Sequence, residues 1–325
     1  MPYCLAIQLG AHKNLSIKMT FRLHLSTPVR TALTERQPIV ALESTLITHG
    51  LPRPLNLEVA QRLEAVVRDN GATPATIALL DGELYAGLEP DQLERLANAE
   101  DVRKVSRRDL PIVTARKGHG ATTVAATMWV AAQAGIKVFA TGGIGGVHDE
   151  SGFDISADLQ ALATIPMIVV CAGTKSILDV PATLEYLETM SVPVIGFGTD
   201  DFPAFYSRES GLEVTEKLDN PQAVIDFAKA HWGAGLQSAV LVANPVPERE
   251  AIPKSEMDPF IDKAKQEAGD RNVYGKELTP FLLERINVLT EGKSMKANLA
   301  LLLNNARLAA RIAKSLRASE RRKIS

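Results

Sequence analysis

The sequence predicts one α/β domain with an α/β/α layered fold: helices cover both faces of a mixed, mostly parallel sheet, and the C-terminal region is helical. Short segments that are apolar almost throughout, such as residues 167–173 and 239–243, alternate with helical segments. Strands of this kind are buried on both faces, as in a parallel sheet covered by helices. The 325 residues contain no internal repeat and no low-complexity linker, so one large domain fits as well as two.

The first half of the chain is predicted to contain a hairpin besides its helices. Asn56 is expected to cap the start of a helix, since asparagine is among the preferred residues there. Apolar runs on either side of Asp81 and Gly82 predict a β-hairpin. Pro90 suits the first turn of a short helix, and residues 111–115 (PIVTA) are predicted to form a strand.

The second half alternates regularly between strands and helices. Strands are predicted at residues 136–143, 166–173, 192–198 and 238–247, and helices at residues 121–135, 156–164, 182–190 and 220–232, with helix again from about residue 255 onward. Basic side chains near the C-terminus are expected on the solvated face of the last helix, because the apolar residues there recur with a spacing close to 3.6.

The two ends of the chain differ in charge from the middle. Residues 1–34 carry four basic residues and no acid, a composition typical of an organelle transit peptide but equally compatible with a disordered extension ahead of a later start at Met19. We therefore expect three parts. They are an N-terminal extension over residues 1–34, a single domain over residues 35–318 that carries the chemistry, and a basic tail over residues 319–325.

Composition excludes several classes of protein. The 36 Lys and Arg are balanced by 38 Asp and Glu, so the net charge of −2 gives no indication of nucleic-acid binding. No apolar stretch approaches the roughly 20 residues that span a bilayer. Two cysteines, Cys4 and Cys171, do not make a disulfide framework, which favours a reducing compartment. We expect a cytoplasmic protein, unless residues 1–34 direct it to an organelle.

Polar groups follow four of the predicted strands at their carboxyl ends. Glu43 follows the strand at residues 39–42, a glycine-rich loop occupies residues 141–148, Lys175 follows the MIVV strand, and Asn244 follows AVLVA. In an open parallel sheet, ligands bind beyond these ends. The convergence predicts a functional site there more firmly than any single motif does.

Glu43 and Lys175 are the candidates for catalysis. A carboxyl group that follows a buried strand loses water, which raises its pKa and suits a general acid or base; alternatively, the hydroxyls of Ser44 and Thr45 simply satisfy Glu43. A desolvated lysine has a lowered pKa and can attack a carbonyl group to form a Schiff base. The alternative is that the amine of Lys175 reaches solvent or a phosphate.

The glycine-rich loop, TGGIGGVH, fits neither the dinucleotide fingerprint nor the P-loop. Its glycines would let backbone amides approach an anion closely, which predicts a phosphate-bearing ligand. The other interpretation is a turn whose glycines are needed only for tight packing. The sequence alone leaves both open.

Asp154 and Asp158 lie four residues apart and would share one face of a helix. Carboxylate oxygens are the ligands that Mg²⁺ and Mn²⁺ prefer. Helix capping is the alternative, with Asp154 or Ser156 as the cap and Asp158 in the first turn.

Eight motifs carry a resemblance to a known family. They are, in chain order, ALESTLITHGLPRP, VSRRDLP, GATTVAATM, FATGGIGGVH, FDISADL, VVCAGTKSILD, VANPVPE and GKELTPFLL. With these motifs the chain resembles the pseudouridine-5'-phosphate glycosidases over about residues 40–314. The resemblance implies a mixed α/β/α fold in a homotrimer, a divalent cation, typically Mn²⁺, and a small-molecule substrate. The implied activity is reversible cleavage of the C–C glycosidic bond of pseudouridine 5'-phosphate to uracil and ribose 5-phosphate.

The resemblance also implies residue roles. Glu43 of ALEST corresponds to the proton donor, Lys175 of AGTKS to the nucleophile, and Asp154 to the metal ligand. Substrate contacts are implied for Lys104, Val124, Thr141, His148, Ser156, Ala157, Asp158 and Asn298. The loop between His148 and Phe153 reads DESG and is shorter than is usual in the family.

The chemistry explains why a lysine and a carboxyl group are needed together. The carbon leaving group of a C-nucleoside departs poorly, so a Schiff base between Lys175 and the ring-opened ribose would serve as the electron sink. Glu43 would protonate C5 of uracil. Two alternatives are a Schiff-base lyase acting on another sugar phosphate and a non-catalytic sugar-phosphate-binding protein, although a binding protein would not need both residues.

Overall fold

The computed structural model describes residues 21–148 and 154–321. Within them lies one sheet of eleven strands. The strands are β1 (Leu23–Leu25), β2 (Ile39–Leu42), β3 (Thr73–Leu80), β4 (Glu83–Ala86), β5 (Val102–Val105), β6 (His119–Thr122), β7 (Val138–Ala140), β8 (Ile168–Cys171), β9 (Val194–Phe197), β10 (Glu216–Leu218) and β11 (Val240–Ala243). Nine of them follow the order β1-β4-β3-β2-β7-β8-β11-β9-β10, while β6 pairs with β3 and β5 pairs with β6.

The sheet is mixed but mostly parallel, as predicted. The strands from β3 through β2, β7, β8, β11 and β9 to β10 all pair in parallel. The antiparallel pairs are β3 with β4 and β3 with β6. The β3–β4 pair is the hairpin predicted around Asp81 and Gly82, both of which have positive φ.

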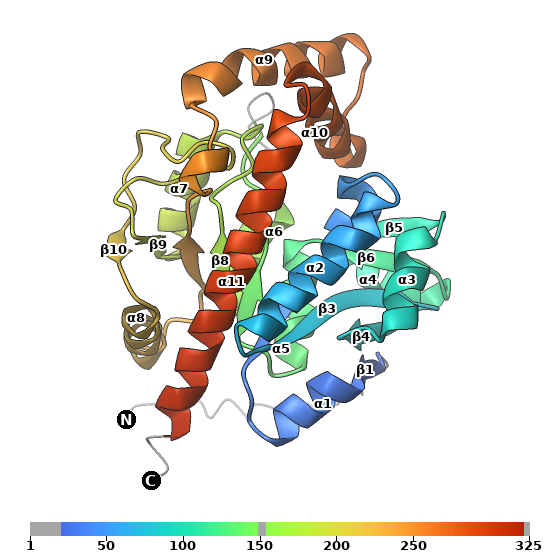
Figure 1. The fold of residues 1–325 in the computed structure, drawn as a ribbon, viewed down its shortest axis with the longest axis vertical. Helices are drawn as coiled ribbons and strands as arrows, with labels where there is room; N and C mark the ends of the chain where they lie inside the picture. The colour runs from blue at the N-terminus through green and yellow to red at the C-terminus, as the bar shows by residue number, and fades with distance from the viewer. Residues whose placement is uncertain (1–20, 149–153, 322–325) are drawn as a thin grey trace, which may run out of the picture.

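Helices cover both faces of this sheet (Figure 1). They are α1 (Thr27–Thr34), α2 (Leu55–Asp69), α3 (Pro90–Asn98), α4 (Leu110–Ala115), α5 (Val124–Gln133), α6 (Ala157–Thr164), α7 (Val180–Thr189), α8 (Pro221–Gly233), α9 (Lys254–Asp270), α10 (Leu278–Leu289) and α11 (Lys293–Arg321), with short helical turns at Leu46–Gly50, Arg107–Asp109, Glu248–Glu250 and Gly275–Glu277. The apolar side chains of α2, α8 and α11 pack on one face, and those of α1, α5, α6 and α7 pack on the other.

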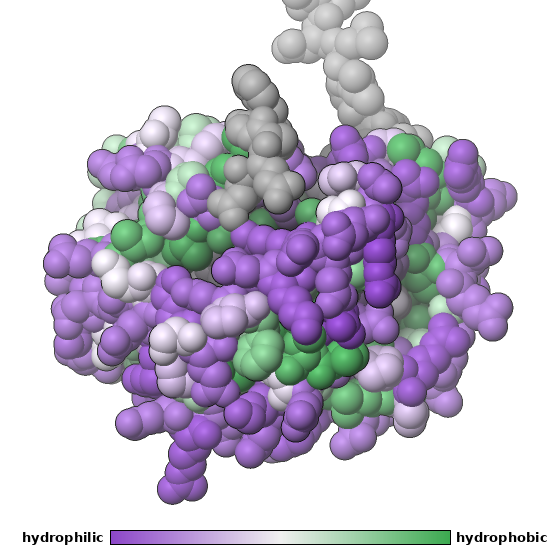
Figure 2. Space-filling model, turned by 90° about the horizontal axis from the view of Figure 1, so that it is seen from above, coloured by the Kyte–Doolittle hydropathy of each residue, from purple (hydrophilic) through white to green (hydrophobic). Residues whose placement is uncertain are grey.

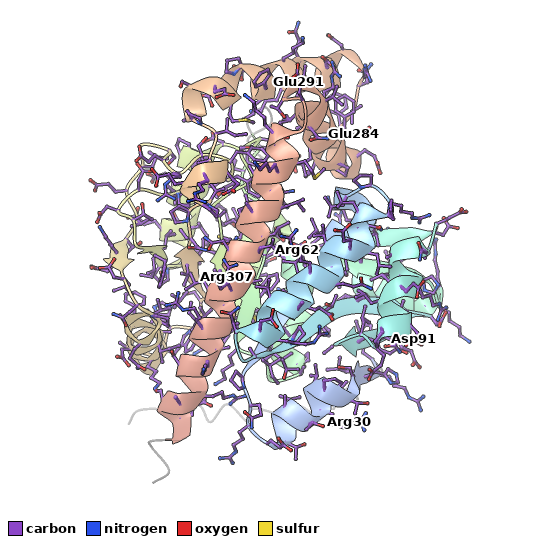
Figure 3. The ribbon with its side chains drawn as sticks, in the orientation of Figure 1. Arg30, Arg62, Asp91, Glu284, Glu291 and Arg307 are labelled. Atoms are coloured by element: carbon purple, nitrogen blue, oxygen red, sulfur yellow. The ribbon has the colours of Figure 1, made fainter. Side chains whose placement is uncertain are left out.

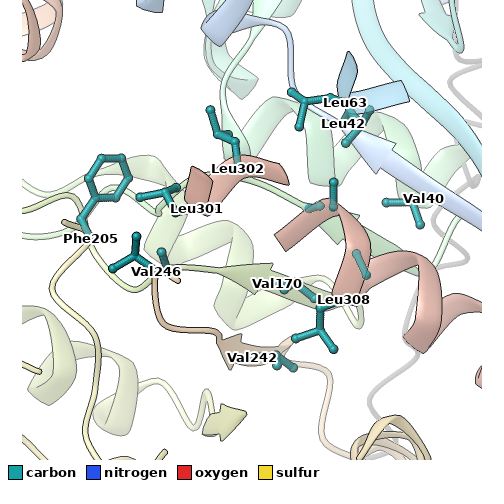
Figure 4. Packing of buried hydrophobic residues seen from close by; sticks show 14 of the residues in the cluster. Val40, Leu42, Leu63, Val170, Phe205, Val242, Val246, Leu301, Leu302 and Leu308 are labelled. Atoms are coloured by element: carbon teal, nitrogen blue, oxygen red, sulfur yellow. The ribbon is translucent and has the colours of Figure 1, made fainter. Parts of the chain in front are cut away.

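The two core layers follow from the alternation of side chains along each strand. In β2, Val40 and Leu42 face the layer of α2 and α11, whereas Ile39 and Ala41 face the layer of α5. Figure 4 shows the first layer, where Leu308 of α11 packs near strand residues such as Val242. Because both faces are buried, the strands are apolar throughout, which is the pattern that predicted a parallel sheet.

Charged side chains lie on the outer sides of the helices. Arg62 on α2, Arg307 on α11 and Glu284 on α10 are exposed and point away from the sheet (Figure 3). Seen from the α9–α10 end, the surface is mainly hydrophilic, with apolar side chains in separate patches (Figure 2). Among the residues that the structure describes, no helix is both long and apolar enough to cross a membrane.

The N-terminal boundary at residue 34 was predicted too late in the chain. Leu23–Leu25 form β1, which pairs in parallel with β4. Residues Thr27–Thr34 form α1, whose Val29 is fully buried against the sheet. The acid-free composition of residues 1–34 did not reveal β1 and α1, because two elements this short need only a few apolar residues. The targeting or disorder prediction was made for residues 1–34, and it stays a prediction for residues 1–20, which lie outside the described part of the chain.

The strand predicted at residues 111–115 is wrong, because that segment forms α4. A capping box in which Ser106 and Asp109 bond reciprocally through side chain and backbone precedes it, and Pro111 lies in its first turn. These start signals outweigh the β-branched residues that suggested a strand. The true strands beside it are β5 and β6, which pair in parallel.

Two helix boundaries also differ from the prediction. The helix expected to start after Asn56 begins at Leu55, with Pro54 as its cap. The side-chain amide of Asn56 instead donates hydrogen bonds to the carbonyls of Ile47 and Ala97, each at 2.9 Å. At the other end α11 continues to Arg321, past the predicted boundary at residue 318.

Gly173 shows how tightly the chain turns after β8. Its φ is +85°, and a Cβ there would lie 1.8 Å from the carbonyl oxygen of Pro203. Gly198 also has a positive φ, +69°, but has open space around it. Substitution of Gly198 by alanine therefore measures the energetic cost of the left-handed backbone alone, whereas substitution of Gly173 adds the cost of the clash with Pro203.

We expect Gly173→Ala to lower the free energy of unfolding by about 3 kcal/mol or more, since it adds a backbone clash to a left-handed conformation. Gly198→Ala, the matched control, should cost only about 1–2 kcal/mol, for the left-handed conformation alone. Urea denaturation followed by circular dichroism measures both. Equal losses in the two variants would contradict the close approach at Gly173.

Candidate active site

A cavity of about 990 Å³ opens at the carboxyl ends of β2, β5, β7 and β8. Ten of the eleven predicted site residues line it. These are Glu43, Lys104, Val124, His148, Asp154, Ser156, Ala157, Asp158, Lys175 and Asn298. The eleventh, Thr141, lies directly behind Glu43. Three of the four predicted strand-end groups therefore meet at the cavity: Glu43, the glycine-rich loop and Lys175. The fourth, Asn244, is buried and does not line it; its side chain donates to Asn305.

Glu43 is the first residue after β2 and is half-buried in the cavity wall. Each of its carboxylate oxygens accepts a hydrogen bond: Oε1 from the hydroxyl of Thr141 and Oε2 from the hydroxyl of Thr45. Ser44 does not take part, because its hydroxyl donates to the carbonyl of Ile77. The carboxyl group is therefore held in one orientation from two directions and still faces the cavity.

Lys175 follows the tight turn after β8 and is half-buried. The turn is fixed because the amide of Lys175 donates to the carbonyl of Ile144 at 3.1 Å, and the carbonyl of Gly173 accepts from the amide of Ile144, also at 3.1 Å. The amine thus projects from a constrained backbone into the same cavity as Glu43.

Lys104 brings a second amine to the cavity from β5. Burial lowers its pKa, and the positive charge of Lys175 lowers the pKa further. The carboxylates of Asp158 and Glu43 act in the opposite direction. These interactions show that Lys104, Lys175, Glu43 and Asp158 lie close enough to influence one another electrostatically.

The glycine-rich loop owes its composition to close packing. Added Cβ atoms would lie 2.6 Å from the ring of Phe205 at Gly143, 2.2 Å from the hydroxyl of Ser156 at Gly145, and 2.2 Å from the hydroxyl of Thr183 at Gly146. Several amides of the loop are already used within the protein. The amide of Gly145 donates to Asp158, and that of Val147 donates to Thr183. The packing interpretation accounts for these glycines better than an amide cradle for phosphate does.

Asp154 and Asp158 do not share one face of a helix, which corrects the prediction. Asp154 precedes α6 and is exposed, whereas Asp158 lies buried in the first turn of α6, which Ser156 caps. The carboxylate of Asp158 accepts hydrogen bonds from the amides of Ala125 and Gly145, both at 2.9 Å. Asp158 therefore ties the start of α5 to the glycine-rich loop, and the capping interpretation of this pair holds for Ser156 and Asp158.

Asp154 is left as the candidate metal ligand. Within residues 21–148 and 154–321, no three His, Cys, Asp or Glu side chains are grouped so as to hold an ion. A hard cation that keeps most of its waters needs only one or two carboxylates. The exposed carboxylate of Asp154 on the cavity wall fits such a hydrated ion, and it does not fit an ion bound wholly by protein side chains. The DESG loop lies in residues 149–153, outside the described part.

Sequence reasoning missed several residues of the cavity wall. Arg107 and Arg108 follow β5, and His49 lies in a π-helical turn after β2. The rule that pointed to Glu43 would have found the arginines as well, had residues 102–105 been identified as the strand. Phe21 and Trp129 also line the cavity and carried no sequence signal. Their rings contact edge to face, with the ring centroids 6.0 Å apart.

Comparison with known proteins gives the same picture. The family model described as "Indigoidine synthase A like protein" matches residues 28–315. The chain is 54% identical to a pseudouridine-5'-phosphate glycosidase of Caldanaerobacter subterraneus over 296 residues, covering 90% of this chain and 96% of that one. It is 55% identical to the protein of the same name from Paracoccus denitrificans over 296 residues, covering 90% of this chain and 97% of that one.

Solved structures agree with these matches. An indigoidine synthase A-like protein of Thermotoga maritima superposes with a TM-score of 0.84 at 38% identity, covering 91% of this chain and 97% of that one. A prealnumycin C-glycosynthase in complex with ribulose 5-phosphate superposes with a TM-score of 0.85 at 39% identity, covering 93% of this chain and 99% of that one. Since the family model and these relatives span nearly the whole chain, the protein belongs to the indigoidine synthase A-like family.

Proposed function

We propose that this protein is a pseudouridine-5'-phosphate glycosidase. It reversibly cleaves the C–C glycosidic bond of pseudouridine 5'-phosphate, with addition of water, and yields uracil and ribose 5-phosphate. One observation carries the proposal: a single cavity holds a carboxyl group oriented by two hydroxyls, Glu43, together with an amine on a constrained turn, Lys175. The names of relatives more than half identical to the chain support the substrate.

In the first step, the amine of Lys175 attacks C1' of the ribose and the C1'–O4' bond breaks. The electron pair of that bond goes to O4', which takes up a proton as the amine loses one. The product is a ring-opened sugar joined to Lys175 by a C–N bond, with uracil still attached to C1'.

In the second step, the nitrogen lone pair forms an iminium with C1' as the C1'–C5 bond breaks. The electron pair of that bond goes to C5 of uracil, which takes a proton from Glu43. Water then adds to the iminium, releases ribose 5-phosphate as the aldehyde and restores the amine of Lys175 and the proton of Glu43. The hydroxyls of Thr45 and Thr141 keep the carboxyl group aimed throughout.

The cationic side of the cavity would hold the phosphate. Lys104 and Arg107 lie on its wall, and charged donors of this kind bind phosphate oxygens strongly. Binding energy gained at the phosphate orients the reacting end of the sugar.

A divalent cation, Mn²⁺ or alternatively Mg²⁺, is proposed at Asp154. When bound, it would order water molecules or neutralise phosphate charge. Asp154 would hold it with one carboxylate, while Glu43 and Lys175 carry out the proton transfer and bond making.

A Schiff-base lyase acting on another sugar phosphate is the second candidate. It is favoured by the solved relative that is a C-glycosynthase and holds ribulose 5-phosphate. The same Lys175 and Glu43 would serve that reaction. Substrate comparison separates the two, since only the first candidate releases uracil.

We expect Lys175→Ala to abolish uracil release from pseudouridine 5'-phosphate, together with the adduct that borohydride traps from ribose 5-phosphate. Glu43→Ala should lower uracil release by about 10²–10⁴-fold and still trap the sugar, because proton transfer to uracil is a separate step. Liquid chromatography measures uracil, and mass spectrometry of the intact protein measures the adduct.

Lys137→Ala provides the control for this pair, since Lys137 is exposed just before β7, at the other end of the sheet. It should keep both activities. Trapping that labels Lys104, or a Lys175→Ala variant that still turns over, would show that the covalent mechanism is wrong.

Asp154→Asn should weaken Mn²⁺ binding by about tenfold or more, because a neutral amide replaces the carboxylate proposed to hold the ion. Electron paramagnetic resonance of free Mn²⁺ measures binding directly, and uracil release after chelation measures the functional consequence. Asp226→Asn on the exposed side of α8 is the control. Wild-type protein that is fully active in excess chelator would refute a functional cation.

We also propose a cytoplasmic homotrimer, on the strength of the family resemblance alone. Multi-angle light scattering at micromolar concentration should give three times the 35.1 kDa chain mass. A monomer under those conditions would contradict the proposal.

A further inference from the structure

A buried amide network lies directly behind Glu43. Asn305 of α11 is completely buried. Its Nδ2 donates to the carbonyl of Thr141 at 2.8 Å and to the carbonyl of Gly142 at 3.3 Å. Its Oδ1 accepts from the Nδ2 of Asn244 at 2.9 Å. The two carbonyls determine the orientation of the amide, since only the NH₂ group of Asn305 can satisfy them.

The bond to Thr141 matters most, because the carbonyl of Gly142 also accepts from the backbone amide of Ala172 at 2.8 Å. Thr141 and Gly142 follow β7, Asn244 follows β11, and β8 runs between these two strands. A buried carbonyl without a partner is costly. Asn305 therefore joins two strand ends that are not neighbours and fixes the backbone of Thr141.

Thr141 passes this constraint to the active site. Its hydroxyl donates to Oε1 of Glu43. The other carboxylate oxygen is held by Thr45, only two residues along the same segment, so Thr141 is the partner that ties Glu43 to the rest of the sheet. Asn298 and Leu302 line the cavity from the same face of α11 as Asn305.

We propose that Asn305 is a positioning residue for the proton donor, acting through Thr141 on Glu43. The inference rests on the proposed function and assigns Asn305 no contact with substrate. It separates two parts of the reaction: loss of the amide should impair protonation of uracil and leave attack by Lys175 intact. A residue that only stabilised the fold would impair both together.

The test compares Asn305→Leu with Asn304→Leu in the full chain. Asn304 is the neighbouring amide on α11 and donates to the carbonyl of Pro245 at 3.2 Å, away from Thr141. We expect Asn305→Leu to slow uracil release by about 10–100-fold, while the rate of borohydride trapping of ribose 5-phosphate stays within twofold of wild type. Asn304→Leu should stay within twofold in both assays.

A double-variant cycle tests the route through Thr141. Thr141→Val alone should slow uracil release, and adding Asn305→Leu to it should give little further loss, because both changes release the same carboxyl group. Additive losses, equal activity of Asn305→Leu and Asn304→Leu, or trapping that falls in step with uracil release would each overturn the inference. Absence of uracil release by wild type would instead refute the proposed function.

Asn305→Asp keeps the test decisive if the leucine variant does not fold. The introduced carboxyl group donates to Thr141 when protonated and cannot donate when ionised, and burial raises its pKa. Uracil release should therefore be retained at low pH and lost as pH rises, more steeply than in wild type. A pH profile parallel to that of wild type would count against the inference.

Discussion

Buried backbone groups beyond the carboxyl ends of the strands need hydrogen-bond partners from the protein itself. The side chains that supply these partners determine the shape of the candidate active site. An unmet bond of this kind costs about 1–3 kcal/mol. The carboxylate of Asp158 accepts from the backbone amides of Ala125 and Gly145, and the side-chain amide of Asn305 donates to the carbonyl of Thr141. Polar side chains that satisfy the backbone thereby also determine where the loops run and where the cavity opens.

The parallel sheet brings Glu43 and Lys175 to the cavity from two separate strands. Glu43 follows β2 and Lys175 follows β8, with β7 between them. Each therefore reaches the cavity from its own rigid strand, and the intervening strand contributes Thr141 to hold the acid. In the proposed mechanism, the two side chains then carry out separate tasks, proton transfer by Glu43 and bond making by Lys175.

Patterns that rest on local chemistry predicted the fold well. Buried strands, the hairpin and the placement of Glu43 and Lys175 at strand ends follow from apolar runs and turn residues near in sequence. The strand at residues 111–115 failed because a capping box and Pro111 outweigh β-branched residues over such a short segment. Contacts from distant segments, such as Asn305 with Thr141 or Phe21 with Trp129, leave no local pattern to find.

The long last helix has a consequence for the order of synthesis. Glu43 and Lys175 both precede α11 in the chain. Asn298 and Leu302 of the cavity wall and the side-chain amide of Asn305 that fixes Thr141 belong to α11 itself. A ribosome builds the chain from its N-terminus, so a nascent chain lacking α11 has both reactive side chains without their enclosing wall. The cavity is therefore complete only after the last helix has been synthesised and has packed against the sheet.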